Sequence, residues 1–270
     1  MSKLDNFWQI RFFESVIGNA QYVITDSTQK PPSDRKELVE WRKGTRARMS
    51  GAERYYVDVF YRVMNLNHVL DRLKQARYLI ARSPGSYRNR AFSINRNDWS
   101  DYHFYVYTTS LASVLDCALL ITAEVFKLGL PPRHCTFDIV TQHDWLAGSQ
   151  VPRTLRSLKK TLEQHIHRRH RYVHRGEESN FDDLTDPDDL LRLRTITFLA
   201  DRGNHLIPRQ TLSWLWKLQI KEVRENFNEI EEKVLQKASD VLECLLPIYE
   251  HNVNIYKPRS VRETEGNPTQ

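Results

Sequence analysis

The residue types best suited to chemistry in this chain gather between Arg168 and Gly176. The stretch reads Arg-Arg-His-Arg-Tyr-Val-His-Arg-Gly, so that Arg169 is followed five positions later by His174. Arginine binds phosphate oxygens through paired hydrogen bonds and keeps its charge. Histidine titrates near neutral pH, as a general acid or base must. Together these residues predict a site that acts on a phosphodiester.

Cleavage of RNA without a metal ion is the chemistry that suits this pair. The ribose supplies its own nucleophile, the 2′-hydroxyl, so the protein needs a base for that proton and a fixed cation for the charge that grows on the phosphate. The expected products are a 2′,3′-cyclic phosphate and a 5′-hydroxyl. We expect no metal and no other cofactor. The histidines offer divalent-metal binding as an alternative, but no acid accompanies them at a hydrolase spacing.

A patterned helix, predicted from Pro152 to about Arg175, must position these residues. At about 100° per residue, Arg169 projects into the middle of an apolar arc. A charge at a core position is costly unless it is paired or used. Pairing with a buried acid, Asp116 or Glu124, is the alternative to a functional role. The arc consists of Val151, Leu155, Leu158, Leu162, Ile166 and Val173, with His170 and His174 on one flank and His165 on the other.

The same helix is strongly basic. Between Arg153 and Arg175 there are eight Lys or Arg, four His and one acid, Glu163, whereas 177–189 holds seven acids and no base. Such a patch suits a polyanion, and a solvated basic face is the other interpretation. The candidate RNA-binding residues are Arg168, Arg171, Arg175, Lys159 and Lys160.

The remaining periodicity predicts an all-α bundle of long, mostly antiparallel helices. Long helices are expected over 51–82, 98–128 and 212–256, with the second as the central one, Pro247 as a kink in the last, and a further helix over 186–200. Before them, 7–25 reads as a helix with a short strand at 22–24, and 33–41 as a short helix. We therefore expect an N-terminal extension (1–50), a helical domain (51–256) and a disordered tail (257–270).

Composition narrows the class of protein further. Hydrophobic residues make up 40% of the 270 residues and glycine is scarce at 9, which supports a helical core. No unbroken apolar run of about 18 residues exists, so we expect no membrane association. The N-terminus lacks the charged and then apolar segments of a signal peptide. The three cysteines are not spaced like metal ligands or like a disulfide framework. We therefore predict a cytoplasmic protein.

The motif Arg169-His170-x-x-x-His174 resembles the Arg-polar-x3-His motif of the HEPN superfamily, and the helical body from about 51 to 256 is similar to its domains. The resemblance implies a metal-independent ribonuclease, often a toxin or anti-phage effector, that works as a homodimer with two motif helices facing one cleft. It implies that Arg169 contacts the scissile phosphate, His174 is the general base or acid, and His170 is the supporting polar residue. The spacing from Arg168 to His174 also fits the looser pattern of the superfamily, so Arg168 is the alternative leading arginine. Some small toxins of the superfamily carry a tyrosine two residues after the histidine, which a partner enzyme modifies; this chain has Gly176 at that position.

Two other functions stay open. One is a non-catalytic helical module that binds RNA or protein, for which the aromatic start of the chain offers a surface (Phe7, Trp8, Phe12, Phe13 and Tyr22). The other is a nucleotide sensor that holds a free phosphate on the same arginine and histidines. For the nuclease, the expected partners are single-stranded or transfer RNA, a second copy of the chain, and a regulatory protein.

Overall fold

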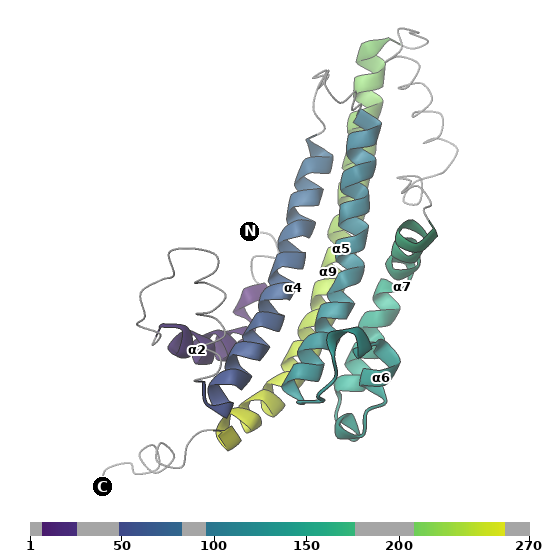
Figure 1. Ribbon diagram of the computed structural model, residues 1–270. Helices are drawn as coiled ribbons and strands as arrows, with labels where there is room; N and C mark the ends of the chain where they lie inside the picture. Colours follow the sequence, from purple (N-terminus) through teal and green to yellow (C-terminus); the bar gives the residue numbers. More distant parts are fainter. Residues whose placement is uncertain (1–6, 26–48, 83–95, 176–207, 257–270) are drawn as a thin grey trace, which may run out of the picture. The chain divides into compact units, whose positions relative to one another are not determined.

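Every element that the structure describes is helical (Figure 1). A computed structural model of the chain describes residues 7–25, 49–82, 96–175 and 208–256. The long helices are α4 (Gly51–Ala81), α5 (Arg96–Val125), α7 (Val151–Arg175) and α9 (Arg209–Tyr256), and α2 (Arg11–Thr25) precedes them. The short elements are η1 (Phe7–Gln9), η2 (Pro132–His134), α6 (Phe137–Thr141) and η3 (Asp144–Leu146). The all-α prediction is confirmed.

The long helices form where apolar residues recur at three- and four-residue spacing. Each residue of the predicted α4 seam is buried, namely Val59, Val63, Leu66, Leu70 and Leu73. The α9 seam is buried from Val223 to Leu245, with Ile230 half-buried. A capping box starts α4: the Ser50 backbone N–H donates to Glu53 Oε2 (2.6 Å), and the Glu53 N–H donates to Ser50 Oγ (3.2 Å).

The contacts divide the chain into two compact units. The first contains residues 1–66, 116–157 and 238–270, and the second contains 67–115 and 158–237. Each of the four long helices contributes residues to both units. The predicted motif lies wholly in the second unit, so its geometry is set by the parts of the helices within that unit.

The aromatic start of the chain belongs to the core of the first unit. Phe7, Phe12 and Phe13 are buried, and the Phe12 ring packs edge-on against Tyr249 of α9 at 5.8 Å between centroids. Asn19 Nδ2 donates to the Tyr249 hydroxyl at 3.4 Å. The predicted interaction surface at these phenylalanines is therefore wrong, because their side chains are used in packing. The predicted strand at 22–24 is also wrong, since α2 continues to Thr25.

Helix α5 is the most apolar of the long helices. Its segment Asp98–Val125 is long and apolar enough to cross a membrane, with a mean hydropathy of 1.5 over an 18-residue window, although the sequence contains no unbroken apolar run of that length. Within that segment, 67% of the most apolar window is buried inside the protein. The burial of α5 is thus that of a core helix, which the sequence predicted as the central one.

Several predictions fall outside the described residues. These are the short helix at 33–41, the acidic run 177–189, the helix at 186–200, and the tail from 257.

Candidate active site

The buried stripe of α7 decides which motif residues face the core. Its buried members are Val151, Leu155, Leu158, Leu162, His165 and Tyr172, and Arg169 is half-buried among them. Steps of seven residues (151, 158, 165, 172) drift by about 20° per heptad around a straight helix. Two predicted members of the arc therefore lie off the stripe: Ile166 is half-buried, and Val173 is 50% exposed.

Tyr172 anchors the motif end of α7 to α5. Its ring lies 6.1 Å from that of Tyr105, tilted by 49°. Figure 1 shows α5 and α7 running in opposite directions. The α7 turn that precedes Tyr172 carries Arg168 and Arg169. Packing at Tyr172 therefore ties the motif end of α7 to α5.

Arg169 lies at the border between core and solvent. Its half-buried position continues the spacing of Leu162 and His165 along the stripe. The stem can lie against apolar surface while the guanidinium reaches a polar boundary. Of the acids predicted as alternative partners, Glu124 binds Arg62 and Lys127 in the first unit, at 3.8 Å and 3.0 Å.

The two motif histidines lie side by side at the surface. The ring centroids of His170 and His174 are 4.9 Å apart, with an interplanar angle of 45°. Both side chains are exposed, because a spacing of four residues stacks them on one flank of α7. The motif thus combines two accessible imidazoles with a half-buried arginine on the same end of α7.

His165 is a third imidazole, and it lies inside the protein. It is 4% exposed, and its Nδ1 has no hydrogen-bond partner among the described residues. Burial and, to a smaller extent, the nearby charge of Arg168 together lower the pKa of His165 from 6.5 to about 4. Sequence reasoning placed His165 on a flank, whereas the heptad spacing from Leu158 to Tyr172 would have placed it on the stripe.

The candidate RNA-binding residues do not form one patch. Lys159, Lys160 and Arg175 are exposed, while Arg168 and Arg171 are half-buried. At about 100° per residue, Lys159 shares the face of His170, whereas Lys160 and Arg171 point to the side opposite Arg169. Lys159 is therefore the candidate lysine that lies on the same face of α7 as His170. Within the described parts of the chain, no group of three or more His, Cys, Asp or Glu side chains is arranged to hold a metal.

One comparison with known proteins gave a match. A family model described as Cthe2314-like HEPN matches residues 63–231, which is more than half of the 270-residue chain. The matched region contains Arg169, His170 and His174. No curated protein matches the chain. No solved structure matches it either.

Proposed function

The chain belongs to the HEPN superfamily, whose family-level roles are RNA-related, nuclease or toxin-like, and we propose that it is a metal-independent endoribonuclease. One observation carries this proposal. At the C-terminal end of α7, a half-buried arginine is followed in the chain by two exposed histidines whose ring centroids are 4.9 Å apart. Membership of the superfamily alone does not require activity, so these side chains carry the nuclease proposal.

The reaction requires one proton removed and one proton supplied. Neutral His174 takes the proton of the 2′-hydroxyl, and the 2′-oxygen forms a bond to phosphorus. The bond from phosphorus to the 5′-oxygen breaks, and an imidazolium donates a proton to that oxygen as it leaves. Arg169 binds the non-bridging oxygens throughout and stabilises their growing charge. The products are a 2′,3′-cyclic phosphate and a 5′-hydroxyl, and His170 supports His174 from its neighbouring position.

We assign the second imidazole to a second copy of the chain. A twofold axis beside α7 brings another His174 and another Arg169 to the same phosphate. The exposure of Val173 supports this arrangement, because an apolar side chain that is 50% exposed lies between the motif residues. A twofold partner covers Val173 and completes the acid–base pair at once.

The direct test is cleavage of single-stranded and transfer RNA by the purified chain in EDTA. We expect products that end in a 2′,3′-cyclic phosphate, identified by mass spectrometry. His174→Ala should lower the rate by about 100-fold or more, as expected for loss of a general base. His68→Ala is the matched control, since His68 is an exposed histidine on α4 in the same unit. Undiminished cleavage by folded His174→Ala protein refutes the assigned role.

The dimer is tested by mixing two inactive variants. Arg169→Ala protein keeps His174, and His174→Ala protein keeps Arg169. If the site is shared between copies, the mixture regains part of the activity that each variant lacks. Val173→Asp should weaken the dimer in sedimentation experiments, with Ile139→Asp as a control at a similarly exposed aliphatic residue (45%). No recovery in the mixture, or a wild-type monomer that cleaves RNA, contradicts a shared site.

The biological role we propose is that of a toxin or anti-phage effector restrained by a partner protein. Induced expression of the wild-type chain should then stop growth, and expression of His174→Ala should not. If the wild-type chain and His174→Ala stop growth equally, the toxicity does not come from RNA cleavage, and the proposed role is refuted.

A non-catalytic RNA-binding module is the second candidate, favoured by the exposed basic side chains of Lys159, Lys160 and Arg175. It predicts binding that weakens steeply as salt rises, with no turnover. A cyclic-phosphate end that depends on His174 excludes it as a full account.

A further inference from the structure

The first unit contains an open pocket that the proposed nuclease does not use. Its volume is about 320 Å³, near the lower end for small-molecule sites. It lies where α5 ends, next to η3 and the last turns of α9. The lining residues are Phe126, Lys127, Trp145, Ile248, Asn252 and Tyr256. The motif histidines belong to the other unit, and the lining residues on α9 lie beyond the matched region.

Lys127 holds an uncommon backbone conformation at this pocket, with φ at 54°. The Lys127 N–H donates to the Glu124 carbonyl (3.1 Å), and the Leu128 N–H donates to the Ala123 carbonyl (2.9 Å). These two bonds form a Schellman motif at the end of α5. Glycine is the residue that favours this left-handed position, and lysine is strained there. The Lys127 side chain makes contacts there that glycine cannot make: an ion pair with Glu124, and a position over the Tyr55 ring with Nζ 4.8 Å from the ring centroid.

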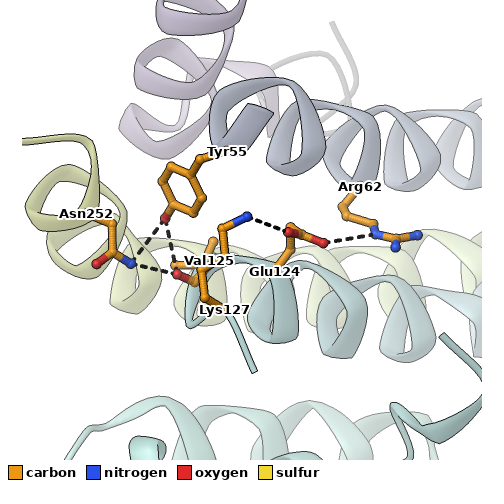
Figure 2. A network of polar contacts seen from close by, with 6 residues as sticks. All are labelled: Tyr55, Arg62, Glu124, Val125, Lys127 and Asn252. Atoms are coloured by element: carbon orange, nitrogen blue, oxygen red, sulfur yellow. Dashed lines mark hydrogen bonds and ion pairs between the residues drawn. The ribbon is translucent and has the colours of Figure 1, made fainter. Parts of the chain in front are cut away.

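The contacts of Lys127 leave a net positive charge beside the pocket. Lys127 Nζ lies 3.0 Å from Glu124 Oε1, and Arg62 Nε lies 3.8 Å from Glu124 Oε2 (Figure 2). One carboxylate is thus shared by two cations, which leaves one positive charge in this group. All three side chains keep contact with solvent, at 21–31% exposure. An anionic group of a ligand can approach Lys127 without displacing a buried ion pair.

The other side chains that line the pocket offer aromatic ring faces and a polar amide group. Trp145 is 63% exposed and Tyr256 is 40% exposed, so ring surface is available for stacking. Asn252 Nδ2 donates to the Val125 carbonyl (2.8 Å) and approaches the Tyr55 hydroxyl (3.3 Å), as Figure 2 shows. Tyr55 in turn donates to the Val125 carbonyl (3.1 Å). Asn252 is held through its amide nitrogen, and its Oδ1 remains the atom with which it can accept a bond from a ligand.

We propose that this pocket binds a mononucleotide, with the base stacked on its aromatic side chains and the phosphate at Lys127. Aromatic rings hold bases of any type by stacking, lysine binds phosphate as a point charge, and an amide oxygen accepts hydrogen bonds from a base edge. A free nucleotide and the phosphorylated end of an RNA share this chemistry. The proposal does not depend on RNA cleavage, since the motif residues take no part in it.

The test is calorimetric titration of the full chain with AMP, GMP, CMP and UMP, and separately with adenosine and inorganic phosphate. We expect one nucleotide per chain, bound more tightly than either adenosine or phosphate. Trp145→Ala should weaken binding by about ten-fold or more. Trp214→Ala is the matched control, since Trp214 is 58% exposed in the other unit.

Lys127→Gly separates binding from stability. Glycine fits φ at 54° better than lysine does, so we expect an unchanged or higher Tm together with nucleotide binding weakened by about ten-fold or more. A short RNA with a 5′-phosphate, titrated into His174→Ala protein to prevent cleavage, distinguishes a chain end from a free nucleotide. Binding of that RNA alone, if lost in Trp145→Ala, identifies the chain end as the source.

Three results overturn the proposal. One is no binding of any nucleotide or RNA end at roughly 1 mM. Another is binding that Lys127→Gly and Trp145→Ala both leave unchanged. The third is nucleotide binding that Arg169→Ala abolishes, because the nucleotide then occupies the motif. Loss of RNA cleavage in His174→Ala is a separate result and leaves the pocket proposal standing.

Discussion

His165→Leu is the substitution that best tests how the motif helix packs. The imidazole is 4% exposed, its pKa is about 4, and its Nδ1 has no partner among the described residues. A buried polar atom without a hydrogen bond costs about 1–3 kcal/mol. Leucine fills a similar volume with no polar atom. At about pH 8 the variant should therefore have a higher free energy of unfolding, by about 1 kcal/mol or more.

The effect should grow as the solution becomes acidic. The pKa of His165 is lowered from 6.5 in the unfolded chain to about 4 in the folded chain. Between these pH values the unfolded chain binds a proton at this histidine and the folded chain does not. Stability from this residue is present above the unfolded pKa and is lost as pH falls toward 4. At about pH 5 the loss is about 2 kcal/mol. Leucine does not titrate, so the advantage of the variant should rise by about 2 kcal/mol between about pH 8 and about pH 5.

The assay is urea unfolding of wild type and variant at both pH values. His68→Leu is the control, since it replaces an exposed histidine on α4. The difference between proteins is the quantity to measure, because other groups titrate in the same window. A difference that is equal at both pH values refutes a neutral, buried His165. A variant less stable than wild type at both values means that the imidazole has a partner.

Three further predictions follow from particular contacts. Burial raises the pKa of Glu231 from 4.5 to about 7 against the opposing charge of Arg77 at 2.7 Å, so its stabilising effect is present below pH 4.5 and lost as pH rises through 7. Glu231→Gln should remove this pH dependence, about 3 kcal/mol over the whole window, in urea unfolding. Phe12→Ala should lower the free energy of unfolding by about 3–5 kcal/mol in the same assay, because Phe12 is fully buried. A change near zero would mean that the N-terminal aromatic side chains are not part of the core. Arg169→Lys should keep Tm but lower RNA cleavage by about ten-fold or more, because lysine lacks the bidentate fork; unchanged cleavage would mean that charge alone suffices.

The structure bears out the part of the sequence analysis that depends on local pattern. Apolar spacing of three and four residues predicted α4, α5, α7 and α9 to within a few residues, since each helix buries one face whatever it packs against. The motif spacing also predicted that His170 and His174 lie on one flank of α7, because residues four apart stack on any helix.

Tertiary packing decided what a straight helix could not show. The seven-residue drift of the stripe buried His165 and Tyr172 and exposed Val173, and it depends on the neighbours that α7 follows. The fate of Phe12 was equally non-local, because its core partner Tyr249 is more than two hundred residues away. The pocket at Lys127 joins the end of α5 to the end of α9 in the same way. Periodicity along one helix therefore determines which residues share a face, and only the assembled units determine which face meets solvent.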